Sequence, residues 1–242
     1  MFELTLIPIC AMFILSGLIY GMFGFGYVLV SVVLLGFLIS VKIAVPMVAA
    51  QVVVLAGWML YGLRRHLRKR IVLPILVGLP FGLPLGVYLL HVLTEESIRR
   101  LLGSVVLLYA LWSSLKVSRT TSALRSDAWG LVAGFLSGII GGAILAAGPI
   151  IVIYLTLRGL RKEEFKATFL LWSVAQSCLL IPFYTMAGML TSRAFLWGAI
   201  ALPFAGVGLL VGMKLFEKVK EQVFYRLVIV LLALSGVHLL FA

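Results

Sequence analysis

Apolar residues dominate the chain in long windows, which charged residues separate at short intervals. Residues without charge run over 4–41, 43–63, 71–94, 101–115, 128–157, 167–192, 194–213 and 227–242. Most of these windows hold the roughly 20 residues that a helix needs to cross the hydrocarbon core of a bilayer. The pattern therefore predicts an all-α integral membrane protein.

Two windows are too long for one transmembrane helix. As straight helices, 128–157 would extend about 45 Å and 4–41 about 57 Å, against a hydrocarbon core of about 30 Å. Each has a glycine cluster, GLIYGMFGFG at 17–26 and GFLSGIIGGA at 134–143. Glycine costs a helix about 1 kcal/mol relative to alanine. Each window is expected to form either a re-entrant hairpin of two half-helices or one tilted helix with an interfacial extension.

The positions of Lys and Arg favour the hairpins. If all eight windows cross the membrane, nine basic residues lie on the side of the 64–70 loop and eleven on the other side. If the two overlong windows enter and leave on one side, sixteen lie with that loop. Because short cytoplasmic loops are enriched in Lys and Arg, the second arrangement is predicted. The four basic residues on the outside are then Lys42, Arg99, Arg100 and Arg193.

The glycine clusters also indicate an internal repeat. A shift of 117 positions aligns three glycines of the first cluster with three of the second. Leu79-Pro80-Phe81 recurs 123 positions later, and Ala50-Gln51 recurs 125 positions later. With one glycine-broken segment and three transmembrane helices in each half, the second half is upside down relative to the first, an inverted-topology repeat. We expect a first repeat over 1–118, a cytoplasmic linker over 119–127 and a second repeat over 128–242.

Composition changes the picture little. The chain is 63% hydrophobic and 12% charged, with a net charge of +12. That charge would suit nucleic-acid binding, but the basic residues lie in loops where the positive-inside rule places them, so no nucleic-acid partner is expected. Cys10 and Cys178 lie in apolar windows without metal-ligand spacing. No disulfide, metal or cofactor is predicted from them.

Acidic residues are missing from the middle of every window. All eight lie at segment ends: Glu3, Glu95, Glu96, Asp127, Glu163, Glu164, Glu217 and Glu221. Cation-coupled transporters often carry ionisable groups within the membrane, so buried cation binding and a proton relay through acids are not expected. The chain also lacks a buried acid, a His/Cys cluster or a Ser/His pair, which disfavours a membrane enzyme.

Broken helices can bind an anion without ionised side chains. Helix N-termini present backbone N–H groups and a positive dipole end, and glycine lets a ligand approach the backbone. The candidate positions are Gly24, Gly26, Gly141 and Gly142, with close helix packing as the alternative role. A glycine-interrupted segment in each half points to the binding site of a transporter.

Two glutamines lie at equivalent places in the middle of their windows, Gln51 and Gln176. A glutamine amide supplies two donors for the oxygens of an anion. The alternative is an interhelical hydrogen bond worth about 1 kcal/mol. Ser173, three residues before Gln176, and Ser31, just after the first glycine cluster, are further candidate donors.

Two prolines also lie in the middle of matched windows, Pro80 and Pro203. Proline removes a backbone hydrogen bond and kinks a helix. A hinge role for both residues in alternating access is a hypothesis.

These motifs resemble the sulfite exporter TauE/SafE family, bacterial permeases for sulfur-containing anions. The likeness rests on Gly17-x3-Gly21-x2-Gly24-Phe25-Gly26, on its echo Gly134-x3-Gly138-x2-Gly141-Gly142, on Pro149, on Leu79-Pro80-Phe81-Gly82-x3-Gly86 and on the segment 95–103. Two features depart from the family pattern. Tyr27 follows Gly26 where the glycine run is usually fuller, and Ser31-Val32-Val33 stands where a proline often occurs.

The resemblance implies a multi-pass transporter of the bacterial inner membrane that moves a small anion, such as sulfite or an organosulfonate, across the lipid bilayer. Alternating access around the two broken helices is the expected mechanism. Export is favoured because an inside-negative potential assists anion exit by about 2.3 kcal/mol per charge per 100 mV. The alternative is a non-transporting membrane assembly or accessory protein. Homo-oligomerisation is left open.

Overall fold

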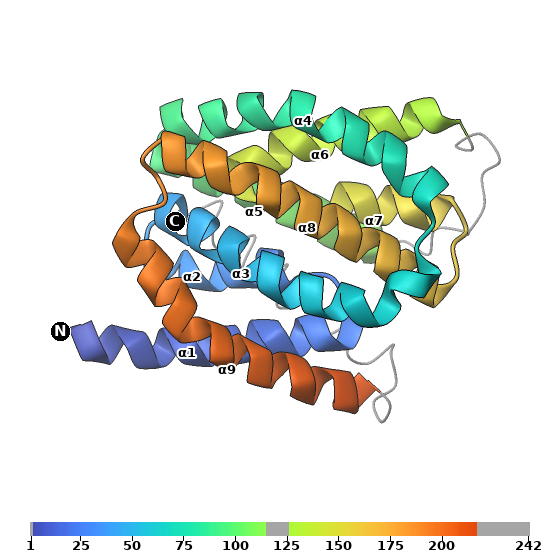
Figure 1. Ribbon diagram of the computed structural model, residues 1–242. Coiled ribbons are helices and arrows are strands. Elements are labelled where there is room, and N and C mark those ends of the chain that lie inside the picture. Colours follow the sequence, from blue (N-terminus) through green and yellow to red (C-terminus); the bar gives the residue numbers. More distant parts are fainter. Residues whose placement is uncertain (1, 115–125, 217–242) are drawn as a thin grey trace. The chain divides into compact units, whose positions relative to one another are not determined.

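The structure, a computed structural model, describes residues 2–114 and 126–216, and every element in these ranges is helical. The last apolar window and most of the expected linker lie outside these ranges. Figure 1 shows the helices in chain order. They are α1 (Phe2–Phe23), α2 (Tyr27–Leu35), α3 (Val41–Leu63), η1 (Arg64–His66), α4 (Lys69–Val92), α5 (Glu95–Ser114), α6 (Asp127–Ile144), α7 (Gly148–Leu157), α8 (Lys162–Met186) and α9 (Ser192–Phe216).

Five stretches of helix in the described residues are long and apolar enough to cross a membrane. They are Val41–His66, Lys69–Val92, Asp127–Ile144, Glu163–Met186 and Ala194–Leu215. The prediction of an all-α membrane protein is therefore confirmed.

The second overlong window forms a hairpin of two helices, α6 and α7. Leu145 ends α6 in the left-handed conformation, with φ of 56°, and Pro149 lies in the first turn of α7, where its missing N–H costs nothing. α7 runs back along α6, because Nη2 of Arg158 lies 3.8 Å from Oδ1 of Asp127. This window therefore begins and ends on the same side.

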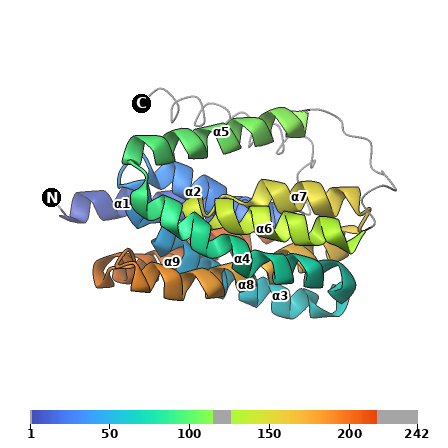
Figure 2. The ribbon, with the colours of Figure 1, turned by 90° about the horizontal axis from the view of Figure 1, so that it is seen from above.

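The first overlong window is broken in the same way, between α1 and α2. Gly24 and Gly26 both have positive φ, 75° and 90°, a conformation that glycine adopts without strain. The ring of Tyr27, the first residue of α2, lies 5.4 Å from the ring of Tyr20 and 6.3 Å from that of Phe13, between centroids. Figures 1 and 2 both place α2 beside α1.

Side-chain caps set the starts of α6 and α8. Oγ of Ser126 accepts a hydrogen bond from the N–H of Ala128 at 3.2 Å, and Asp127 lies in the positive first turn of α6. Oε2 of Glu164 reaches back to the N–H of Arg161 at 3.3 Å at the start of α8. These caps fix where the two apolar helices leave the charged loops.

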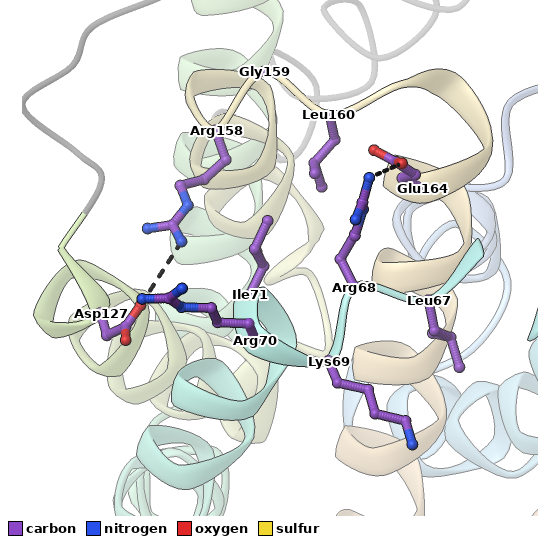
Figure 3. Close-up of a pocket in the computed structure, with 10 residues that line it drawn as sticks. All are labelled: Leu67, Arg68, Lys69, Arg70, Ile71, Asp127, Arg158, Gly159, Leu160 and Glu164. Carbon is purple, nitrogen blue, oxygen red and sulfur yellow. Dashed lines mark hydrogen bonds and ion pairs between the residues drawn. The ribbon is translucent and has the colours of Figure 1, made fainter. Parts of the chain in front are cut away.

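An ion pair decides between the two topologies considered from the charges. Nη2 of Arg68, just before α4, lies 2.5 Å from Oε1 of Glu164, in the first turn of α8 (Figure 3). Eight crossings would put the 64–70 loop and the 158–166 loop on opposite sides of the membrane. The ion pair excludes that arrangement and agrees with the predicted hairpin over 128–157.

Contacts divide the chain into two units, and each unit combines helices from both halves of the sequence. Among the described residues, the first comprises 49–93 and 126–190, and its main crossing is α4 on α6. Within the same described ranges, the second comprises 2–48, 94–114 and 191–216, and its main crossing is α1 on α9. The predicted sequence repeats therefore differ from the packing units, since each hairpin packs on a long helix of the other half.

Glycines allow the backbones of α4 and α6 to touch. A Cβ at Gly82 would overlap the carbonyl oxygen of Phe135, and one at Gly138 would lie 2.6 Å from that of Leu79. Real Cβ atoms essentially never come closer than 3.0 Å to such an atom. This close crossing is the packing role of small residues in membrane helices.

The α1–α9 crossing repeats the α4–α6 crossing residue by residue. In the α1–α9 crossing, Gly17 and Gly21 pack on the backbone carbonyls of Ala205 and Leu209. In the α4–α6 crossing, Gly134 and Gly138 pack in the same way on the carbonyls of Ile75 and Leu79. The opposite helices do the same in return. Gly208 and Gly212 of α9 pack on the carbonyls of Ile14 and Leu18, and Gly78 and Gly82 of α4 pack on those of Leu131 and Phe135. All four contacts correspond when α1 and α6 are related by 117 positions and α4 and α9 by 130.

This register agrees with the shift of 117 positions between the glycine clusters and differs from the shift expected for α4 and α9. The recurrence of Leu-Pro-Phe predicts a shift of 123 positions between α4 and α9. The glycine contacts give a shift of 130, which is seven positions longer. Pro80 and Pro203 therefore lie about two helical turns apart in the repeat and are not equivalent.

Candidate functional site

A stripe of polar and aromatic residues on α8 packs beside the second glycine break. Thr168, Trp172, Gln176 and Tyr184 lie four or eight residues apart and are all buried. Residues at this spacing share one face of a helix. Three of them contact α6, which carries the second glycine cluster.

Hydrogen bonds tie the stripe to α6 on both sides of Gln176. Nε1 of Trp172 donates to Oγ of Ser137 at 3.3 Å, and this hydroxyl donates to the carbonyl of Gly134 at 2.9 Å. The hydroxyl of Tyr184 donates to the carbonyl of Gly142 at 2.9 Å. The position of α8 relative to α6 is therefore fixed at both ends of the stretch that carries Gln176.

The amide of Gln176 lies directly on Gly141. A Cβ at Gly141 would overlap Nε2 and lie 2.7 Å from Cδ of Gln176, so only glycine leaves room for the amide. The side chain is 3% exposed, and its Oε1 is buried without a hydrogen-bond partner among the described residues. Buried polar atoms are nearly always paired with protein, water or a ligand. An unpaired amide oxygen next to a glycine is therefore a place where a polar partner is needed.

A 180° rotation of a glutamine side-chain amide exchanges the positions of its oxygen and its NH2 group. That rotation puts the NH2 group of Gln176 where Oε1 lies, and the orientation of an amide follows the partners it finds. The site can thus offer donors to an anion and an acceptor to water. It contains no charged side chain.

Gly141 and Gly142 lie inside α6 rather than at a helix start. Their N–H groups belong to the regular hydrogen bonding of the helix, which continues to Ile144. The carbonyl of Gly141 also accepts from the N–H of Leu145 at 2.8 Å. The backbone donors expected at these two glycines are therefore in use within α6, and what the glycines offer is space.

The first break differs in its donors. The N–H of Gly24 donates to the carbonyl of Tyr20 at 2.7 Å, and Gly26 caps the start of α2. The N–H of Val30 donates to Gly26, so the first-turn amides of Val28 and Leu29 are the ones an α-helix leaves for outside partners. α7 has Pro149 in its first turn and therefore one donor fewer.

The predicted site residues fall in both packing units. Gly24, Gly26 and Ser31 belong to the α1–α9 unit, whereas Gln51, Gly141, Gly142, Ser173 and Gln176 belong to the α4–α6 unit. Ser31, Gln51 and Ser173 are buried, at 1%, 2% and 8% exposure. Within the α4–α6 unit, the structure brings Gly141 and Gln176 into contact.

Sequence reasoning missed Ser137 and Tyr184. Both make hydrogen bonds next to the Gln176–Gly141 contact. The four-residue spacing from Thr168 to Tyr184 was a usable signal, because it places polar groups on one face of an apolar helix. Among the described residues, no three His, Cys, Asp or Glu side chains gather where they could hold a metal ion.

Comparison with known proteins identifies the family. The family model described as Sulfite exporter TauE/SafE matches residues 9–239. A protein of Comamonas testosteroni described as "Probable inner membrane transporter protein TsaS" is 28% identical over 179 residues, which cover 72% of this chain and 73% of the relative. No solved structure matches.

The family match covers nearly the whole chain and agrees with the apolar helices. Because the family consists of transporters, the match sets aside both an enzyme and a non-transporting accessory protein. The chain belongs to the TauE/SafE family and is a multi-pass transporter of the bacterial inner membrane.

Proposed function

We propose that this transporter exports small sulfur-containing anions, such as sulfite or an organosulfonate, by alternating access around its two broken segments. The observation that carries the proposal is the buried amide of Gln176, packed on Gly141 with one polar atom unpaired. Sulfite and sulfonate present several acceptor oxygens, which the amide NH2 would satisfy. The description of the matched family names sulfite as well.

The other candidate residues would bind the anion within their own packing units. In the α4–α6 unit, Gly141 and Gly142 would leave space for the anion because they have no side chains. Ser173 and Gln51 of the same unit would donate hydrogen bonds to it. In the α1–α9 unit, taken by itself, Gly26 and the amides after it would offer backbone donors to an anion, with Ser31 on the same short helix. Gly24 would shape the turn rather than donate, because its N–H is already bonded.

A neutral site suits export. Neutral donors hold an oxyanion less tightly than a buried cation would, since hydrogen bonds of a charged donor are about twice as strong. Release is correspondingly easier. The inside-negative potential then drives a monovalent anion outward by about 2.3 kcal/mol per 100 mV. No coupling carboxylate is required for this direction.

The close crossing limits which parts can move. α4 and α6 touch along their backbones, so the two helices would move as one body. α7 is only ten residues long and cannot cross the bilayer alone. We therefore place the gating movement in the short half-helices. If Pro80 is a hinge, α6 has to bend with α4, because the flanking Gly78 and Gly82 pack on the α6 backbone.

The test is flux of radiolabelled sulfite and of a taurine-like sulfonate from proteoliposomes. Gln176→Glu keeps the shape of the side chain but puts a negative charge beside the anion. We expect its flux to fall at least about tenfold. Repulsion between the new carboxylate and the anion opposes binding by about 1.4 kcal/mol or more, which is a factor of ten in affinity. Cys178→Ser is the matched control, since Cys178 is two residues away and exposed.

Two outcomes separate the site from the function. Wild-type flux in Gln176→Glu would remove Gln176 from the site and leave the substrate class standing. Absence of flux or binding for every sulfur oxyanion tested in the wild-type protein would refute the substrate class itself.

A further inference from the structure

One end of the α4–α6 unit contains an open cavity of about 770 Å³. Four segments form it: the start of α4, the start of α6, the loop after α7 and the first turn of α8 (Figure 3). Its charged lining consists of Arg68, Lys69, Arg70, Arg158, Asp127 and Glu164. This cavity is separate from the Gln176–Gly141 contact, and the proposed transport does not use it.

Positive charge is in excess in this cavity. Two of its four cations are paired, Arg68 with Glu164 at 2.5 Å and Arg158 with Asp127 at 3.8 Å. The two carboxylates therefore leave a formal excess of two positive charges, matching Lys69 and Arg70. In Figure 3 the guanidinium of Arg70 points toward Asp127 and Arg158, so its charge adds to that of Arg158 on this side of the cavity.

One of the four basic side chains that line the cavity, Arg158, is buried. Its side chain is only 9% exposed, and it forms an ion pair with Asp127, whose side chain is 54% exposed. Nη1 of Arg158 also donates to the carbonyl of Ser126 at 3.4 Å. Because water reaches this guanidinium little, its attraction for an anion in the cavity is screened less than that of an exposed cation.

The helix ends add to the same field. α4, α6 and α8 all begin at this cavity, with Lys69, Asp127 and Lys162 as their first residues. Helix N-termini carry partial positive charge that favours phosphate and other anions. The helix dipoles therefore attract an anion to the same place as the basic side chains.

The place of the cavity at the ends of membrane-length helices is the level expected for lipid headgroups. It opens at the ends of α4, α6 and α8, each long and apolar enough to cross the bilayer. Its uncharged lining includes Leu67, Ile71 and Leu160. The positive-inside rule assigns this end to the cytoplasmic leaflet, where anionic lipids bind basic pockets between transmembrane helices.

We propose that this cavity binds the headgroup phosphate of an anionic phospholipid of the cytoplasmic leaflet. Lys69 and Arg70 supply the unpaired charge, Arg158 supplies the buried donor, and the apolar lining contacts the glycerol end of the acyl chains. A free phosphate has the same oxyanion chemistry, so the test has to distinguish the two sources.

The test measures the unfolding temperature of the purified full-length protein in neutral detergent during titration. The probes are phosphatidylglycerol, phosphatidylcholine and inorganic phosphate. We expect phosphatidylglycerol to stabilise the protein at lower concentration than phosphatidylcholine, with little effect of inorganic phosphate. Arg70→Gln should weaken the apparent affinity for phosphatidylglycerol about fivefold, since one cation near an anionic lipid is worth about 1 kcal/mol.

Two controls make the result specific. Arg65→Gln removes the same charge from η1, outside the cavity lining, and should leave the affinity unchanged. Arg70→Lys keeps the charge and should retain most of the affinity if Arg70→Gln acts through charge rather than folding. Equal effects of the two lipids, or equal loss in Arg70→Gln and Arg65→Gln, would overturn the proposal. Stabilisation by inorganic phosphate at the lipid concentration would assign the cavity to free oxyanions instead.

Discussion

The amide of Gln176 lies on the Cα atom of Gly141, and no side chain fits between these two residues. Gln176 belongs to α8, which carries the polar stripe, and Gly141 belongs to the glycine cluster that precedes the break between α6 and α7. The contact joins the two features that the sequence marks most clearly.

Gly141→Ala should impair transport more than it impairs stability. The new Cβ meets the movable end of the Gln176 side chain rather than backbone, so Gln176 can turn away at a cost of about 1 kcal/mol. Flux in proteoliposomes should nevertheless fall about tenfold, because the amide leaves its place. Gly57→Ala, on α3 with nothing near the new Cβ, is the control and should transport normally.

Gly82→Ala should impair folding itself. Its Cβ would overlap the backbone carbonyl of Phe135, which cannot move without shifting α6. Overpacking of this kind costs about 1–3 kcal/mol, measurable as a lower unfolding temperature in detergent. Gly206→Ala meets nothing within 4 Å and should be neutral or more stable by up to about 1 kcal/mol. Equal stability of the two variants would contradict the backbone contact between α4 and α6.

Tyr184→Phe should lower the free energy of unfolding by about 1 kcal/mol, the net value of one hydrogen bond. The lost bond is the one from its hydroxyl to the carbonyl of Gly142 at 2.9 Å. The matched control is Tyr88→Phe, because Tyr88 is 61% exposed. If both changes leave stability the same, the hydroxyl of Tyr184 does not tie α8 to α6.

Cysteine labelling tests the hairpin directly. In a protein without native cysteines, Arg65→Cys and Glu163→Cys should react with a membrane-impermeant reagent only from the cytoplasmic side. Glu96→Cys, beyond the far end of α4, should react only from outside. Labelling of Arg65→Cys and Glu163→Cys from opposite sides would rule out the Arg68–Glu164 ion pair and the hairpin together.

The turning points of the chain could be predicted because charge and helix length constrain them. Residues 128–157 are too long to cross once, and the basic residues on both flanks belong on one side. The ion pairs at Arg68 and Arg158 agree with that reasoning. The place of the break was harder to predict, because packing of Gly142 on α4 and of Gly141 on Gln176 of α8 keeps both glycines helical in spite of their low helix propensity.

The crossing partners could not be predicted from local patterns. Pairing of α1 with α9 connects residues far apart in the chain, and no periodicity of α1 identifies its partner. The Leu-Pro-Phe recurrence misled the alignment of α4 and α9, because it pairs Leu79 with Leu202, whereas the glycine contacts pair the carbonyl of Leu79 with that of Leu209. Only the opposing carbonyls, such as Ile75 and Ala205, reveal the true register.

The exchange of helices between the two halves has a consequence for biosynthesis. α1 is made first, yet the helix that covers its glycine face, α9, is made after every other described helix. Until then the ribosome has delivered α1 without its packing partner, while the α4–α6 pair can already close. A nascent chain stopped before Ser192 would hold one finished crossing and one open face. Maturation of this protein in the membrane is therefore completed by its late segments rather than helix by helix.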